Sequence, residues 1–115
     1  MNSRVGQDGA TPWMRETELF TSGAEGYHTF RIPSLVIASD GTILAFCEGR
    51  KYGQGDHEAL YLLLKRSTDN GATWQGLQVI AGDGSISTHN PTAVVDRETS
   101  AVWLLFNKDC YTSHA

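Results

Sequence analysis

The chain has 115 residues and a formal net charge of −4, from 9 basic and 13 acidic side chains. Hydrophobic residues make up 40% of it, which is the composition of a folded domain and excludes a disordered chain. The length allows one domain at most, the acidic balance argues against a nucleic-acid-binding surface, and no apolar run reaches the roughly 18 residues of a membrane-spanning helix.

Residues 1–17 are polar and have no apolar periodicity, so we expect a poorly ordered leader. Beyond them, short apolar runs with β-branched residues are separated by turns rich in Gly, Asp and Asn, which is the pattern of β-strands. The best local signal is a hairpin turn at Asp40-Gly41. Both of its flanking runs are apolar without alternation, which predicts strands covered on both faces. The expected strands are residues 34–38, 42–47, 59–66, 77–81, 91–95 and 101–106.

These strands predict an all-β fold. Two longer polar segments, 48–58 and 82–90, are expected to be loops, and no segment has the pattern of a helix. The strand spacing suits a sandwich, a barrel or a propeller. A four-stranded propeller blade takes about 40–45 residues, so this chain would hold between one and two blades. Because propellers close with about 4–8 blades, the propeller would be incomplete.

The cysteines and histidines point to no metal and no cofactor. Cys47 and Cys110 can form one disulfide at most, and Cys47 lies in an apolar run, where a buried free thiol is expected. The four histidines lack the spacing of metal ligands. They are His28, His57, His89 and His114.

The most specific motif runs from Ser67 to Trp74 and matches S-x-D-x-G-x-T-W at every fixed position. Gly71 can adopt a positive φ in a tight turn, and the Asp69 carboxylate can accept backbone N–H bonds there. Ser67 and Thr73 are expected to bond across the two strands, with the Trp74 ring beneath the hairpin. The motif resembles the Asp-box of sialidases and of several other propeller proteins, where it lies away from the active face. We therefore predict a structural role for Asp69.

A second motif, Phe30-Arg31-Ile32-Pro33, resembles the FRIP motif near the N-terminus of cellular and bacterial sialidases. A guanidinium binds a carboxylate with two parallel hydrogen bonds, so an arginine at a strand end could hold the carboxylate of sialic acid. The alternative is an arginine at the rim whose head group only reaches water. The FRIP match followed by an Asp-box favours Arg31 as a substrate ligand.

A third stretch, residues 45–51, resembles the AFAE-x-R-K sequence of the same family and leads into a glycine-rich loop that contains Asp56. The resemblance implies that Asp56 is the general acid and base of glycoside cleavage. An aspartate that only caps a turn beside glycine is the alternative, and Glu58 is a rival carboxylate. The resemblance also implies that Arg50 lines the pocket, and a solvated loop charge is the alternative.

The sequence His89-Asn90-Pro91 resembles an Asn-Pro step that opens the second blade in many relatives. There Asn90 would contact the substrate, although an Asn-Pro turn explains the residue equally well. The candidate site residues are therefore one acid/base, Asp56, and three substrate-binding residues, Arg31, Arg50 and Asn90.

The resemblance covers residues 20–106 and implies a six-bladed propeller of an exo-α-sialidase, which releases terminal sialic acid from glycoconjugates with retained configuration. Such an enzyme uses a tyrosine nucleophile with a glutamate partner, and three arginines clamp the substrate carboxylate. Only the first arginine and the aspartate have counterparts here, and Tyr111 lacks the context of the nucleophile. We therefore expect residues 18–115 to be an N-terminal propeller portion that is inactive alone. The alternative is a non-enzymatic Asp-box propeller that serves as a binding or assembly module, which would not need Arg31 together with Asp56.

Overall fold

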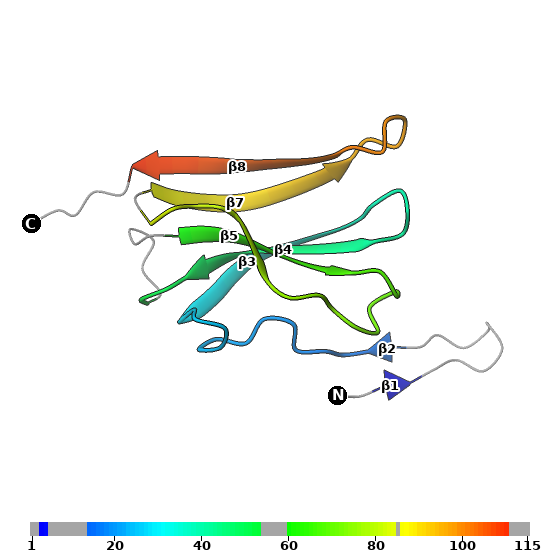
Figure 1. Cartoon of the computed structure of the whole chain (residues 1–115), viewed down its shortest axis with the longest axis horizontal. Helices are drawn as coiled ribbons and strands as arrows, with labels where there is room; N and C mark the ends of the chain where they lie inside the picture. Colours follow the sequence, from blue (N-terminus) through cyan, green and yellow to red (C-terminus); the bar gives the residue numbers. More distant parts are fainter. Residues whose placement is uncertain (1–2, 5–13, 54–59, 85, 111–115) are drawn as a thin grey trace, which may run out of the picture.

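The computed structural model describes residues 3–4, 14–53, 60–84 and 86–110, and all regular structure among them is β-strand (Figure 1). The strands form three antiparallel sheets: the pair β1–β2, a four-stranded sheet in the order β3-β4-β5-β6, and the pair β7–β8. We call the four-stranded sheet the first sheet and β7–β8 the second sheet. The strands are β1 (Ser3–Arg4), β2 (Met14–Arg15), β3 (Thr29–Ile37), β4 (Ile43–Arg50), β5 (Leu60–Ser67), β6 (Gln78–Ala81), β7 (Ile86–Val95) and β8 (Val102–Cys110).

The first sheet has an apolar cluster on each face. On one face, Tyr27, Cys47 and Leu63 are buried, and side chains of the chain before β3 pack against them. On the other face, Leu44, Phe46 and Leu64 are buried. There the second sheet packs against them with Val102 and Leu104. β4 is therefore buried along almost its whole length, because it is a central strand with both faces covered.

The segment before β3 is fastened to the first sheet through Lys65. The Lys65 ammonium donates to the Leu19 carbonyl at 2.7 Å and to the Glu25 carboxylate at 2.8 Å. It also lies 5.1 Å from the centre of the Phe20 ring, within the range of a cation–π contact. This polar anchor holds the aromatic residues of the segment over the apolar face of β4 and β5.

All six predicted strands are present, but their ends are wrong. β4 continues through Arg50, into the segment expected to be a loop, and β7 begins at Ile86, inside the other expected loop. The prediction that both strands of the first hairpin are covered on both faces holds for β4 and fails for β3. Leu35 and Ile37 on β3 are exposed, because only the opposite face of that strand packs against the second sheet.

Candidate functional site

The Asp-box forms a closed turn around Asp69. Ser67 donates its hydroxyl hydrogen to the Asp69 carboxylate at 2.8 Å, and both the backbone N–H and the hydroxyl of Thr73 donate to it as well. These bonds lower the pKa of Asp69 to about 2. Asn70 and Gly71 have positive φ values of 62° and 89°, as a tight turn requires. The structural prediction for Asp69 fits this geometry.

The expected bonding of Ser67 and Thr73 across two strands is wrong. Both hydroxyls instead converge on the same carboxylate within the turn, and the Ser67 oxygen also accepts the N–H of Gly71 at 2.8 Å. A carboxylate has enough lone pairs to accept all these donors, so the turn satisfies its polar groups without help from neighbouring strands. Asp69 is thus occupied by its own turn.

β3 and β7 carry the same irregularity. On β3, Ile32 and Pro33 lie opposite the single residue Cys47, and on β7, Asn90 and Pro91 lie opposite Phe106, which makes each a β-bulge. The residue before each proline has a positive φ, 57° at Ile32 and 54° at Asn90. Proline is tolerated here because β3 and β7 are edge strands and a bulge needs no ladder hydrogen bond.

A positive φ at Ile32 is a strained conformation, because a β-branched side chain clashes with its own backbone there. Such strain costs about 1–3 kcal/mol and is concentrated at functional sites. The residue before the Ile32 bulge is Arg31, and the residue before the Asn90 bulge is His89. The two bulges therefore mark equivalent places in the two sheets: the candidate residue Arg31 precedes the first bulge, and the candidate residue Asn90 is part of the second.

The buried carboxylate of Glu48 joins the two sheets at this place. Its Oε1 accepts a hydrogen bond from Arg50 Nη2 at 2.7 Å, and its Oε2 accepts the backbone N–H of Asn90 at 2.8 Å. The side chains of Glu48 and Arg50 are only 1% and 3% exposed. A second cross-sheet bond, from the Thr88 hydroxyl to the Leu60 carbonyl at 2.9 Å, lies close by. Arg50 and Asn90, predicted from separate motifs, are brought together through one carboxylate.

Glu48 was missed as a site residue because it was placed at the start of a loop. The sequence did contain a signal, since a charged residue directly after a buried apolar run must find a partner if the strand continues. A residue in an exposed loop needs no such partner, so the predicted loop gave no reason to look for one. In the structure Glu48 has two partners, Arg50 on its own strand and the backbone N–H of Asn90 on the second sheet.

Arg31 lies directly opposite Glu48 in the β3–β4 register. Residues paired in this way project from the same face of a sheet, so the Arg31 and Glu48 side chains are neighbours. Arg31 is exposed whereas Glu48 is buried, and no described residue forms an ion pair or hydrogen bond with the Arg31 guanidinium. The Glu48 charge is balanced by Arg50. Arg31, Glu48 and Arg50 together therefore carry an excess positive charge, which faces solvent at Arg31 and suits an anionic ligand.

Asp56, the predicted acid/base, and its rival Glu58 lie outside the described residues. β4 ends at Arg50 and β5 begins at Leu60, which is paired with Arg50. The segment that contains both acids therefore starts and ends beside the ion pair of Glu48 and Arg50. Among the described residues, no group of His, Cys, Asp and Glu is arranged to hold a metal ion. In the same ranges there is no helix with the length and apolarity needed to cross a membrane.

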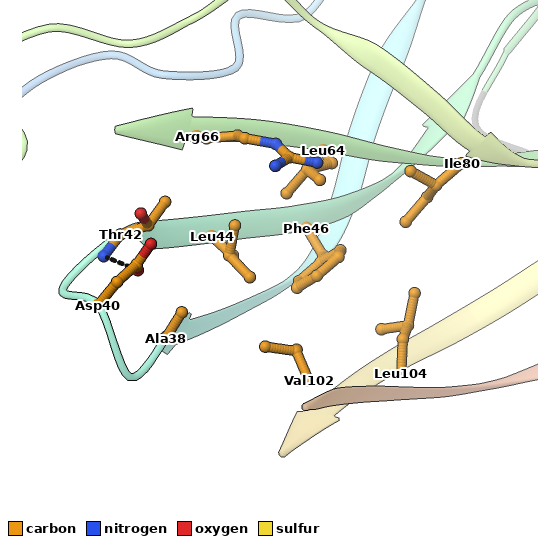
Figure 2. A pocket seen from close by; sticks show the side chains of 10 residues that line it. All are labelled: Ala38, Asp40, Thr42, Leu44, Phe46, Leu64, Arg66, Ile80, Val102 and Leu104. Atoms are coloured by element: carbon orange, nitrogen blue, oxygen red, sulfur yellow. Dashed lines mark hydrogen bonds between the residues drawn. The ribbon is translucent and has the colours of Figure 1, made fainter. Parts of the chain in front are cut away.

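A cavity of about 420 Å³ lies between the sheets at the other end of β4 (Figure 2). Leu44 and Phe46 line one wall and Val102 and Leu104 the other, near the Asp40 turn. Asp40 accepts the N–H of Thr42 at 2.9 Å, which closes that turn. The cavity is mainly apolar and is separate from the cluster of Arg31, Glu48 and Arg50.

No protein-family model matches the chain. Comparison with curated proteins gives a consistent result. The chain is 38% identical over 95 residues to an exo-alpha-sialidase of Arthroderma benhamiae, covering 77% of this chain and 23% of the relative. It is also 38% identical over 96 residues to an exo-alpha-sialidase of Aspergillus fumigatus, covering 77% and 24%, and 34% identical over 99 residues to a sialidase of Micromonospora viridifaciens, covering 83% and 15%. The chain belongs to the sialidase family. It spans about a quarter or less of the length of these relatives.

The fold agrees with that of a solved sialidase. The structure of the Hadza microbial sialidase Hz136 matches with a TM-score of 0.73 at 23% identity, covering 80% of this chain and 20% of that one. The predicted all-β, incomplete propeller is therefore confirmed, with antiparallel sheets that do not close into a ring. In this sialidase-family chain the first sheet has the four antiparallel strands of a propeller blade, and the second sheet is a two-stranded antiparallel pair packed beside it.

Proposed function

We propose that this chain supplies one side of the active site of an exo-α-sialidase, which releases terminal sialic acid from glycoconjugates with retained configuration. The observation that carries the proposal is the Glu48 network, which joins Arg50 and the Asn90 bulge beside the exposed Arg31. A structural ion pair alone would not require a strained bulge next to Arg31, whose guanidinium has no ion-pair or hydrogen-bond partner among the described residues.

Arg31 binds the carboxylate of sialic acid in this proposal. Its guanidinium offers two parallel donors that match both oxygens of a carboxylate. The exposure of Arg31 leaves these donors accessible, and the neighbouring Glu48 is already neutralised by Arg50, so it does not repel the substrate's charge. Arg50 and Asn90 line the same pocket from the two sheets, with Glu48 as the residue that positions them.

Asp56 acts as the general acid and base. It donates a proton to the glycosidic oxygen as the bond to the sugar breaks, and it later removes a proton from the water that releases the sugar. The segment between β4 and β5 that carries it leaves the sheet directly after Arg50, which favours a position over the bound sugar. Glu58 is the rival for this role.

The chain alone is expected to be inactive, because the sialidase scheme also needs a tyrosine nucleophile, its glutamate partner and two further arginines. No residue of this chain matches those motifs. The purified 115-residue chain should therefore release no sialic acid from a fluorogenic sialoside. Release of sialic acid by the chain alone would contradict this part of the proposal.

A chimera tests the site itself. This chain would replace the matching segment of the Aspergillus fumigatus exo-alpha-sialidase, to which it is 38% identical. The chimera is expected to hydrolyse the sialoside, the Asp56→Ala variant to lose turnover, and the Glu58→Ala variant to keep it. A chimera that unfolds cooperatively as a monomer but has no activity would instead favour the binding or assembly module.

A further inference from the structure

His89 on the second sheet is the counterpart of Arg31 on the first. Each directly precedes a two-residue bulge that ends in proline, and each lies on an edge strand of its sheet. Arg31 lies opposite Glu48 in the register, and His89 lies opposite Asn107. Because the blades of a propeller repeat around a central channel, equivalent residues of neighbouring blades lie at the same end of it. His89 therefore belongs to the end of the molecule at which Arg31 is exposed.

The two sheets differ in the charges at these equivalent positions. In the first sheet Arg50 forms an ion pair with Glu48, and Arg31 has no described partner. In the second sheet the position of Arg50 is held by Asp109, whose Oδ2 lies 3.3 Å from His89 Nε2. An imidazole carries a charge only when it is protonated, so this pair is ionic only in the imidazolium form of His89.

The two ring nitrogens of His89 differ in their surroundings. Nε2 is buried and forms no hydrogen bond with a described residue, so its polar neighbour is the Asp109 carboxylate. Nδ1 also has no hydrogen-bond partner within residues 14–53, 60–84 and 86–110. A neutral imidazole has one donor and one acceptor, whereas an imidazolium donates from both nitrogens. Because Nε2 lies beside a carboxylate, protonation makes Nδ1 a donor for a ligand.

The peptide group that follows His89 is part of the proposed pocket. The N–H of Asn90 donates to Glu48 Oε2 at 2.8 Å, and Glu48 lies opposite Arg31. His89 is therefore one residue away from the network beside the exposed guanidinium. Glu48 and Arg50 neutralise each other within this network, so they add no net charge to the surroundings of His89.

The elements packed against this end of β7 bring few other charges to His89. β5 contacts β7 there through uncharged groups, since the Thr88 hydroxyl donates to the Leu60 carbonyl. Lys108 is paired with Thr88, so it projects from the face of the second sheet opposite to His89. The charged groups on the packed elements are Arg31 on β3, Glu48 and Arg50 on β4, and Lys108 and Asp109 on β8. When His89 is neutral, the Asp109 carboxylate on its own face is therefore left without a counter-charge.

We propose that the imidazolium of His89, held by Asp109, is a second donor for the anionic substrate beside Arg31, so that substrate affinity falls when His89 loses its proton. The inference rests on the proposed function, because that function places the sugar acid at Arg31. Protonated His89 cancels the Asp109 charge and offers Nδ1–H to an oxygen of the sugar, whereas neutral His89 leaves Asp109 to repel the substrate. Histidine changes its charge between about pH 5 and 8. KM is therefore expected to rise over that window, while cleavage of the bond stays with Asp56.

The chimera with the Aspergillus fumigatus exo-alpha-sialidase tests this through KM for the fluorogenic sialoside at about pH 5.5 and about pH 7.5. KM of the unmodified chimera is expected to rise at least about fivefold between them, as for a lost charge-assisted hydrogen bond. His89→Gln should have the higher KM at both pH values with kcat changed by no more than about twofold, and His89→Lys, which keeps a charged donor, should restore the lower KM at both. His28→Gln is the matched control, because His28 is an exposed histidine whose Nδ1 lies 2.6 Å from the Thr29 hydroxyl, and it should keep the unmodified pH profile.

Binding of free sialic acid to the Asp56→Ala chimera, measured by titration calorimetry at the same pH values, separates this inference from the proposed function. Tighter binding at the lower pH that His89→Gln abolishes supports the inference. A pH dependence that persists in His89→Gln, or a variant that lowers kcat and leaves KM unchanged, overturns it while the proposed function stands. A folded chimera that neither binds sialic acid nor hydrolyses the sialoside overturns both.

A second variant keeps the test decisive if His89→Gln loses the circular dichroism spectrum of the unmodified chimera. Asp109→Asn then replaces it, because the Asp109 side chain is 70% exposed and tolerates the change. It removes both the partner of the imidazolium and the charge that repels the substrate, so the rise of KM with pH should become smaller. An unchanged profile in Asp109→Asn overturns the inference.

Discussion

Substitution of Glu48 by alanine is expected to lower the free energy of unfolding more than any surface change in the chain. It removes the Arg50 ion pair and the acceptor for the Asn90 N–H together, and it leaves a guanidinium that is 3% exposed in the interior. Removing one partner of a buried ion pair costs about 3–5 kcal/mol. Because a small domain has only about 5–15 kcal/mol in total, this variant should be marginally folded.

Urea denaturation followed by tryptophan fluorescence measures the effect, in solutions dilute enough to sediment as a single species. Glu48→Gln keeps one acceptor without the charge, so it should lose about 1.5–3 kcal/mol, the value of a hydrogen bond to a charged group. The double variant Glu48→Leu/Arg50→Met replaces the pair with apolar side chains and should recover most of the loss. A Glu48→Ala cost below about 1 kcal/mol, as for an exposed pair, would refute the buried network.

Three further changes follow from the structure. A Cβ at Gly49 would lie 2.8 Å from a ring carbon of Tyr27, so Gly49→Ala should lower the free energy of unfolding by about 1–3 kcal/mol in thermal unfolding. Gly76→Ala, in open space, should change it by no more than about 0.5 kcal/mol. Equal effects of the two substitutions would contradict the packing of Tyr27 against β4. The pKa of Asp69 is lowered to about 2 from 3.8, so its stabilising contribution is present above the unfolded value of 3.8 and is lost as the pH falls from there towards 2. The urea midpoint should fall over that window and change less in Asp69→Asn; identical pH profiles would count against the turn. Burial raises the pKa of Cys47 to about 12. In a Cys110→Ser background, a thiol reagent should therefore label Cys47 of the native chain at least about a hundredfold more slowly than Cys47 of the unfolded chain. Rapid labelling of the native chain would disprove the burial.

The strands could be predicted from the sequence because apolar runs between Gly, Asp and Asn turns are a local signal. Their ends could not, because the polar residues at the end of β4 belong to a strand only when the second sheet satisfies them. From the sequence alone Glu48 resembles a loop residue, because its hydrogen-bond partner, the backbone N–H of Asn90, lies far along the chain. The local pattern, a charged residue directly after an apolar run, shows that Glu48 needs a partner if the strand continues, but only the tertiary structure shows which partner it has.

The candidate site was predictable in part for the same reason. Arg31, Arg50 and Asn90 came from short motifs, and the structure brings the last two together through a residue that the motifs did not single out. The bulges at Ile32 and Asn90 could have been suspected, since a proline inside a strand points to an edge or a bulge. That the two bulges are equivalent follows only from the pairing register.

The central claim is that Arg31 binds the substrate carboxylate, and the Arg31→Ala variant of the chimera tests it most directly. The matched control is Arg66→Ala, which removes an exposed guanidinium whose one hydrogen bond among the described residues is to the Gln78 side chain. We predict that kcat/KM for the sialoside falls at least about a hundredfold in Arg31→Ala, because a charge-assisted pair with the substrate is lost, and stays unchanged in Arg66→Ala. Equal kcat/KM values for the two variants would contradict the account.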